Sequence, residues 1–152
     1  VGSHQTGLQG ITISPDVDGF KAESVWKNVE AQPNITHGVR VGSHYYGIGD
    51  PAKLVCVDIA TGKTAWSDNS LFFPDPKRAM AAFIVMGKNI LTLSSGGELC
   101  LFEASPKGFN ELGRTQACGI NWCMPAYVDG WLFVRDGIKK KGGNLICLDL
   151  TD

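Results

Sequence analysis

The sequence contains no long apolar run. Within its 152 residues, no stretch approaches the ~18 consecutive apolar residues that a membrane-spanning helix needs. The first residues also lack the charged segment followed by an apolar segment that marks a secretory signal peptide. We therefore expect no membrane span. Because the chain opens in mid-pattern at Val1, a signal peptide or an earlier domain before this residue is left open.

An excess of charge of one sign is also absent. Fourteen Lys and Arg residues face fifteen Asp and Glu residues, which gives a formal net charge of −1. The single basic run, Lys139 to Lys141, lies beside two glycines and indicates a solvated hairpin tip. Nucleic-acid-binding proteins carry a basic patch or stripe, so we expect no nucleic-acid partner.

Amphipathic helical periodicity is missing as well. The best candidate, 75–86, begins with Asp75 and Pro76 but then turns continuously apolar, which predicts a strand preceded by at most one helical turn. The 19 glycines stand singly between short apolar runs, a pattern typical of many tight turns. These features predict an all-β protein.

Motifs that carry catalytic chemistry are not found. The segment 47–51 lacks the third glycine of a dinucleotide-binding loop, and no Gly-x-Ser-x-Gly nucleophile elbow occurs. Ser94 and Ser95 precede two glycines and fit a turn, whereas Asp16 and Asp18 fit capping roles. We therefore assign no catalytic residue.

The five cysteines leave at least one thiol unpaired within the chain. Cys118 and Cys123 are spaced to close a short disulfide loop, and this stays open beside two free thiols. They are too far apart for the usual Cys-x-x-Cys metal ligand pair, so we expect no metal site. Cys56, Cys100 and Cys147 lie in apolar runs and suit small buried hydrophobes.

Internal repeats are what the sequence does contain. The tetrapeptide Val-Gly-Ser-His at 1–4 recurs at 41–44, an offset of 40 residues. The tryptophans and the aspartates eight residues before them keep this offset: Trp26 with Trp66, and Asp18 with Asp58. Two weaker copies follow in the second half of the chain.

Each copy contains two apolar strands around an x-Gly turn, a third strand ending in Asp or Glu, and in some copies a fourth ending in Trp. This content and period predict the four-stranded antiparallel blades of a β-propeller. We expect one partial propeller domain, 1–152, with about 3.5 blades at approximately 1–28, 37–68, 80–116 and 121–150. The first blade lacks its opening strand and the last its closing strand.

An open arc of blades exposes two apolar flanks, because a blade cannot bury both faces alone. The sequence therefore predicts either a piece of a larger propeller or a homo-oligomer that closes one. The two alternatives differ in the expected mass in solution.

The best-preserved copy, 54–66, predicts a strand, a tight turn in which Gly62 has a positive φ, and a second strand ending at Trp66. Residues 56–66 closely resemble the tryptophan-docking repeat of quinoprotein-type β-propellers, Ala-x-Asp-x-x-Thr-Gly-Lys-x-x-Trp, with Cys56 in place of the alanine. The tail, 125–149, resembles the closing blade of pyrroloquinoline-quinone-like (PQQ-like) repeat proteins.

The resemblance assigns structural, blade-docking roles to four residues. Trp66, and in the same way Trp26, is expected to lie flat between neighbouring blades. Gly62 is expected to make the turn, and Asp58 to accept hydrogen bonds from the turn amides.

The PQQ-like superfamily includes PQQ-dependent dehydrogenases and the periplasmic scaffold of the outer-membrane assembly machine. The dehydrogenases are recognised by adjacent cysteines, a Ca²⁺ site and a catalytic aspartate, and this chain has neither adjacent cysteines nor an aspartate assignable to that role. The resemblance therefore implies a non-catalytic binding or scaffold module without a cofactor, periplasmic or extracellular in a bacterium. The alternative is the C-terminal part of a PQQ- and Ca²⁺-dependent alcohol or sugar dehydrogenase.

Protein partners are expected in either of two places. One is the tops of the blades, where the hairpin loops gather, and the other is an exposed sheet edge that accepts an added strand.

Overall fold

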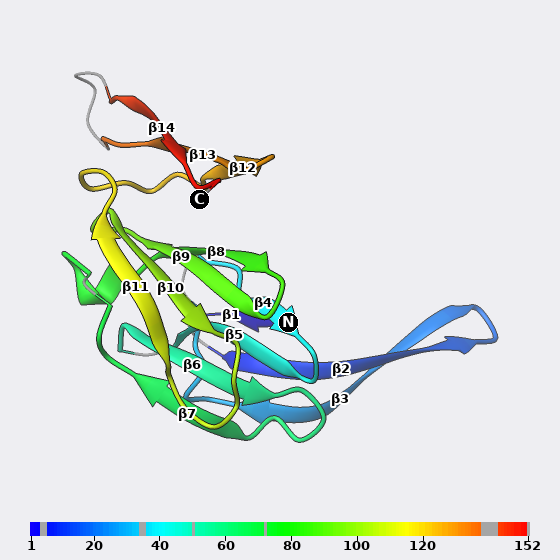
Figure 1. Cartoon of the computed structure of the whole chain (residues 1–152). Helices are drawn as coiled ribbons and strands as arrows, with labels where there is room; N and C mark the ends of the chain where they lie inside the picture. The colour runs from blue at the N-terminus through cyan, green and yellow to red at the C-terminus, as the bar shows by residue number, and fades with distance from the viewer. Residues whose placement is uncertain (4–5, 34–35, 50, 72, 138–142, 152) are drawn as a thin grey trace.

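The computed structural model describes residues 1–3, 6–33, 36–49, 51–71, 73–137 and 143–151. Across these residues the chain is all-β and forms four antiparallel sheets in chain order (Figure 1). Two sheets have four strands and the outer two have three in the described residues. The predicted fold class is confirmed. The predicted basic tip at Lys139 to Lys141 lies outside the described residues.

The first and second sheets contain seven strands among the described residues. The first sheet comprises β1 (Gly2–Ser3), β2 (Gly7–Asp16) and β3 (Gly19–Asn28). The second sheet comprises β4 (Val39–Val41), β5 (His44–Gly49), β6 (Lys53–Asp58) and β7 (Thr64–Asp68).

The third and fourth sheets complete the arrangement in the described part of the chain. The third sheet comprises β8 (Ala81–Met86), β9 (Asn89–Ser94), β10 (Glu98–Glu103) and β11 (Glu111–Gln116). The fourth sheet comprises β12 (Ala126–Val128), β13 (Trp131–Arg135) and β14 (Leu145–Asp149).

The helical content agrees with the prediction for 75–86. A single 3₁₀ turn, η1 (Pro76–Arg78), is capped by Asp75, whose carboxylate accepts a hydrogen bond from the Lys77 backbone N–H at 3.0 Å. Proline at the start of the turn has its φ preset, and β8 begins three residues after the turn ends. Among the described residues, no helix has the length and apolar character needed to span a membrane.

Apolar side chains fill the spaces between successive sheets. Val55 and Val57 of the second sheet pack with Leu8 of the first, and the largest cluster joins the second and third sheets. A third cluster joins the third and fourth sheets through side chains such as Leu91 and Leu132. Each sheet therefore buries at least one face against a neighbour in the chain, as blades do.

A β-bulge marks the same place in three of the sheets. In the pairing of the third blade strand with the fourth, the register shifts once. The residue before the shift pairs with one residue of the fourth strand, and we call that residue's place the docking position. The pairs are Gly10 with Trp26, Cys56 with Trp66, and Leu101 with Gly113. The bulges thus align the blades residue by residue.

This alignment corrects one predicted equivalence. Asp58 lies two residues after Cys56, so its counterpart in the first sheet is Thr12, two residues after Gly10. Asp18 instead follows the end of β2, at the tip of a long hairpin (Figure 1). The shared spacing of eight residues before a tryptophan arises from different backbone paths.

The tetrapeptide repeat is a second wrong equivalence. Gly2 and Ser3 form strand β1, whereas Gly42 and Ser43 lie in the turn between β4 and β5. The remaining member of the first copy, His4, is outside the described residues. The two copies therefore occupy different parts of their blades.

Candidate functional site

At the junction between the first and second sheets, Trp26 contacts the turn after β6. Its indole Nε1–H donates a hydrogen bond to the Ile59 carbonyl at 2.8 Å. Its ring lies against Gly62, where a Cβ would come within 2.5 Å of a ring carbon. Gly62 also has a φ of +71°, which other residues adopt only with strain. Two independent constraints therefore require glycine at this turn.

The carboxylate of Asp58 stabilises the same turn by accepting hydrogen bonds from it. One carboxylate oxygen accepts hydrogen bonds from the backbone N–H and the hydroxyl of Thr61, each at 2.8 Å. These hydrogen bonds lower the pKa of Asp58, with a smaller contribution from His44, whose Nε2 lies 3.8 Å from the second oxygen. The carboxylate is thus directed at its own turn.

Asn28 was not predicted as a site residue, yet its buried amide joins the first two sheets. Its Nδ2 donates to the Gly62 carbonyl at 2.7 Å and to the Thr64 hydroxyl at 2.9 Å. Its Oδ1 accepts from the backbone N–H groups of Glu30 and Ala31. The available signal was an Asn two residues after Trp26, where the second blade has Asp68.

At the junction between the second and third sheets, Trp66 occupies the equivalent position. Its Nε1–H donates to the Ser105 carbonyl at 2.7 Å. Its ring centroid lies 6.1 Å from those of both Tyr46 and Phe109, in tilted arrangements that aromatic pairs favour. Both sequence-predicted tryptophans therefore reach from one sheet to the loop that follows β6 or β10 of the next.

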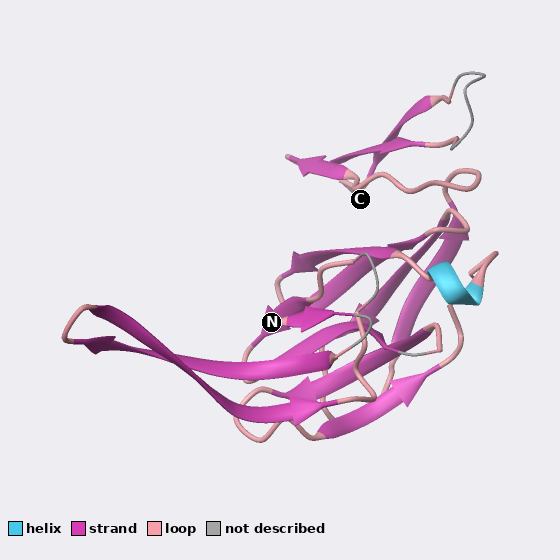
Figure 2. Ribbon diagram, turned by 180° about the vertical axis from the view of Figure 1, so that it is seen from behind, coloured by secondary structure: helices cyan, strands magenta, loops and turns pink. Residues whose placement is uncertain are grey.

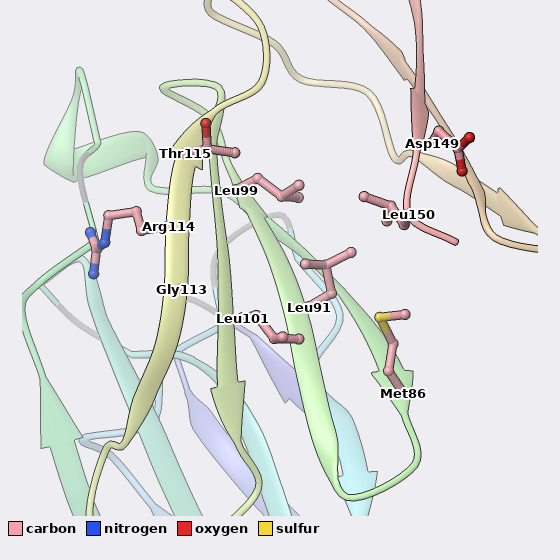
Figure 3. Close-up of a pocket in the computed structure, with 9 residues that line it drawn as sticks. All are labelled: Met86, Leu91, Leu99, Leu101, Gly113, Arg114, Thr115, Asp149 and Leu150. Carbon is pink, nitrogen blue, oxygen red and sulfur yellow. The ribbon is translucent and has the colours of Figure 1, made fainter. Parts of the chain in front are cut away.

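At the junction between the third and fourth sheets, the docking position holds Gly113. A Cβ built there meets no atom within 4 Å. The adjoining space is a pocket of about 460 Å³ that opens between the two sheets (Figure 3). Its lining residues are Met86, Leu91, Leu99, Leu101, Gly113, Arg114, Thr115, Asp149 and Leu150. We call this space the Gly113 slot.

The lining of the Gly113 slot is mainly apolar. Leu91 and Leu99 are buried in the cluster that joins the two sheets. Figure 3 shows Leu150 pointing toward the leucines, while the carboxylate of Asp149 points away from them. The slot is therefore an apolar recess whose polar groups lie at its margin.

The side chain of Arg114, next to Gly113, lies on the opposite side of β11. Its guanidinium donates to Glu98 at 2.7 Å, to Glu111 at 2.6 Å and to the Ser70 carbonyl at 2.7 Å. This arrangement lowers the pKa of Glu111. Figure 3 shows the guanidinium directed away from the leucines. Arg114 thus ties the third sheet to the loop after β7 and leaves the slot unfilled.

The long hairpin formed by β2 and β3 projects from the rest of the chain (Figure 2). After the bulge at Gly10, pairing continues for six residue pairs, from Ile11 with Ser24 to Asp16 with Gly19. In the second sheet, one pair follows the bulge. We call residues 11–24 the hairpin arm.

One face of the hairpin arm is apolar. Cross-strand partners share a face, and faces alternate along a strand, so the register separates the two sets of side chains. The apolar face carries Ile11, Ile13, Pro15, Phe20 and Ala22, with Ser24 at the end next to the blade. Phe20 is 82% exposed and Ile13 is 68% exposed. The opposite face carries Thr12, Ser14, Lys21 and Glu23.

All five cysteines are free, including Cys118 and Cys123, and burial raises the pKa of the Cys56 and Cys100 thiols to about 11. In the part of the chain that the structure describes, no three His, Cys, Asp or Glu side chains gather as a metal-binding group.

Trp131 and Trp122 keep 43% and 44% of their surface exposed.

No protein-family description matches the sequence. No curated protein sequence matches it either. Among solved structures, the chain is similar to BamB from Moraxella catarrhalis, with a TM-score of 0.60 and 14% sequence identity over 95% of this chain. A computationally designed protein, Ika8, aligns over 82% of the chain with a TM-score of 0.37 and 10% identity, too low to carry an argument.

The similarity to BamB shows the β-propeller fold. This chain spans 48% of the length of that protein. The four sheets described above are therefore consecutive blades, or parts of blades, of a propeller.

Proposed function

We propose that this chain is a non-catalytic binding and scaffold module of the PQQ-like repeat family, acting in the periplasm or outside the cell of a bacterium. The docking-motif resemblance of 56–66 supports the family, and the propeller fold shared with BamB supports a role in protein interaction. The proposed partner is another protein, and the hairpin arm is the part of this chain that engages it.

The observation that carries the proposal is the exposed apolar face of the hairpin arm. An isolated two-stranded hairpin is only marginally stable in water, because it has no second layer on which to bury an apolar face. Six residue pairs at ~3.4 Å each extend the arm by about 20 Å beyond the blade. A protein surface that covers Ile13 and Phe20 supplies the missing layer.

The charges on the hairpin favour a protein over a membrane surface. Within 7–28 the acidic residues are Asp16, Asp18 and Glu23, and the basic residues are Lys21 and Lys27. The segment therefore has one more negative than positive charge, whereas binding to anionic lipid needs clustered Lys and Arg.

The experiment compares the two faces of the hairpin arm by site-specific crosslinking. A photoreactive phenylalanine analogue replaces Phe20 on the apolar face or Lys21 on the polar face, and the protein is irradiated in the source bacterium. We expect a defined adduct from position 20 and a much weaker one from position 21. The captured protein is then purified, and its affinity for Phe20→Asp and for the matched control Lys21→Asp is measured by calorimetry.

Two results would contradict the proposal. One is equal crosslinking from both faces, and the other is equal affinity of the two aspartate variants for the purified partner. A separate assay addresses enzymatic function: PQQ and Ca²⁺ are added to the full-length protein, and dye-linked alcohol oxidation is followed. Clear turnover would replace the scaffold role with the dehydrogenase alternative.

A further inference from the structure

The Gly113 slot is the third member of a series in which the first two members are filled by indole rings. The bulge register places Gly113 at the position of Trp26 and Trp66, on the strand face that turns toward the next sheet. Because glycine has no side chain, the third junction keeps the geometry of a docking position without its ring.

The wall of the slot matches the wall behind Trp66. There, Cys56 pairs with Tyr46 on the neighbouring strand, and the indole of Trp66 packs on Tyr46. In the third sheet the corresponding pair is Leu101 with Leu91. Two leucines provide an apolar surface on which a flat ring can lie, at the same distance along the blade.

The far side of the slot matches the turn that receives Trp26. Asp149 ends β14 as Asp58 ends β6, and a carboxylate oxygen of each accepts both the backbone N–H and the hydroxyl of a threonine, which stands three residues after Asp58 and two residues after Asp149. Leu150 follows Asp149 as Ile59 follows Asp58. The Leu150 carbonyl therefore corresponds to the Ile59 carbonyl that accepts the indole N–H of Trp26.

We propose that the Gly113 slot binds the indole ring of a tryptophan side chain presented by a partner protein. Its apolar wall suits the ring, and Leu150, which lines the slot, has a backbone carbonyl that can accept the ring N–H. The slot is continuous with the buried interface between the third and fourth sheets, since Leu91 and Leu99 belong to both. Its volume of about 460 Å³ lies within the ~300–1,000 Å³ of ligand pockets.

This site is independent of the hairpin arm, which lies on the first sheet. A failed crosslinking experiment at Phe20 leaves the slot proposal standing, and a failed slot experiment leaves the hairpin proposal standing. The two can therefore be judged separately.

The test uses the full chain and N-acetyl-tryptophanamide, which presents an indole on a peptide backbone. Heteronuclear NMR titration is expected to show saturable shifts confined to Met86, β9, β10, β11 and residues 149–151. Two further probes define the chemistry. N-acetyl-leucinamide is expected to give no saturable shift, and the 1-methylindole analogue, which lacks the N–H donor, is expected to bind more weakly.

Gly113→Trp supplies the missing ring from within the chain and is expected to abolish binding of the probe. It is also expected to raise the midpoint of thermal unfolding, because the position has open space around its Cβ. Gly113→Leu is the second filling variant if the first fails to fold. Val85→Trp is the matched control, since Val85 pairs with Ile90 on the face of the third sheet that turns toward the second sheet, away from the slot, and is 44% exposed.

Three outcomes would overturn the proposal. Unsaturable shifts spread over the surface would show that the slot has no affinity for an indole. Binding of free indole without binding of N-acetyl-tryptophanamide would assign the slot to a small molecule. Concentration-dependent dimerisation that Gly113→Trp removes would identify a second copy of this chain as the occupant.

Discussion

Trp26 connects two blades through a small number of atoms. Its ring covers the Gly62 turn and its N–H reaches the Ile59 carbonyl, while Asn28, two residues later on the same strand, satisfies the Gly62 carbonyl. Buried polar groups that lose their partners cost more than the hydrogen bond itself contributes. Removal of either side chain therefore leaves unsatisfied carbonyl groups at a blade junction.

Trp26→Ala is expected to lower the free energy of unfolding by about 3 kcal/mol, the lower end of the range for Trp-to-Ala changes, because the ring is only partly buried. The measurement is urea denaturation followed by far-ultraviolet circular dichroism. Trp131→Ala is the control, and its 43% exposed ring should contribute under about 1 kcal/mol. Equal losses in the two variants would refute the docking role of Trp26.

Asp58 links stability to pH. Its pKa is lowered in the folded state, so its contribution is fully present above the ordinary carboxyl range near pH 4 and is lost as the pH falls through the depressed pKa. Asp58→Ala should be less stable than the native chain at pH 7, and this difference should shrink as the pH falls below 4. Urea titrations at a series of pH values measure it, and a difference that does not change with pH would contradict the assignment.

The sequence identified residues that stand out by their type within a repeated motif. It did not identify residues that matter because of where they lie in the pairing of two strands. Trp26 and Trp66 are visible because they recur at a fixed offset, and Gly62 is visible because it lies within the recognisable motif 56–66. Asn28 and Gly113 matter through their register with a bulge on the neighbouring strand, and a bulge leaves no mark in a single sequence. The pocket was therefore not predicted.

At the scale of elements, the first sheet has three described strands where the second has four, and one of its hairpins is extended. Both have three residue pairs before the bulge, which shows that the blade portion is conserved in geometry. Of the six pairs beyond the bulge in β2 and β3, five have no counterpart in the second sheet. The blade should therefore fold without the arm.

Replacement of residues 11–24 by the short turn of the second blade, 57–64, is expected to leave the blade folded and to abolish partner binding. The three pairs from Leu8 to Gly10, together with Trp26 and Asn28, remain in place. Thermal unfolding is expected to shift by no more than about 4 °C, equivalent to roughly 1 kcal/mol or less. A variant that cannot fold would show that the arm belongs to the core of the blade.

The hairpin arm also shows where sequence periodicity failed. Asp18 precedes Trp26 by the same eight residues that separate Asp58 from Trp66, and the match suggested equivalent turns. In one case those residues include a tight turn at the blade, and in the other they run along an extended strand. Equal spacing in the sequence means that the two segments have the same number of residues. It does not determine whether those residues form a turn or a strand.

At the scale of the whole molecule, the blades interact mainly with their neighbours in the chain. In such repeat architectures stability is a sum of local and nearest-neighbour terms, so unequal junctions open at unequal rates. Two junctions have a docked tryptophan, and the third has Gly113. The β-propeller architecture was predicted correctly because it depends on repeated content, whereas this inequality depends on one absent side chain.

The fourth sheet is therefore expected to open before the central ones. Native-state hydrogen exchange should show faster exchange at β13 and β14 than at β5, β6, β9 and β10. Gly113→Trp should slow exchange in the fourth sheet while leaving β5 and β6 unchanged. Uniform exchange across all four sheets would mean that the chain opens as a single cooperative unit.

The position of Trp26 has a mechanical consequence. Phe20 and Trp26 lie on the same strand, β3, so a force applied near the tip of the hairpin arm is transmitted along one continuous backbone to the indole and to Asn28. The indole N–H of Trp26 and the side-chain amide N–H groups of Asn28 are donated to the second sheet. A partner that pulls on the tip of the hairpin arm therefore applies force, at the bulge, to the junction between the first and second blades.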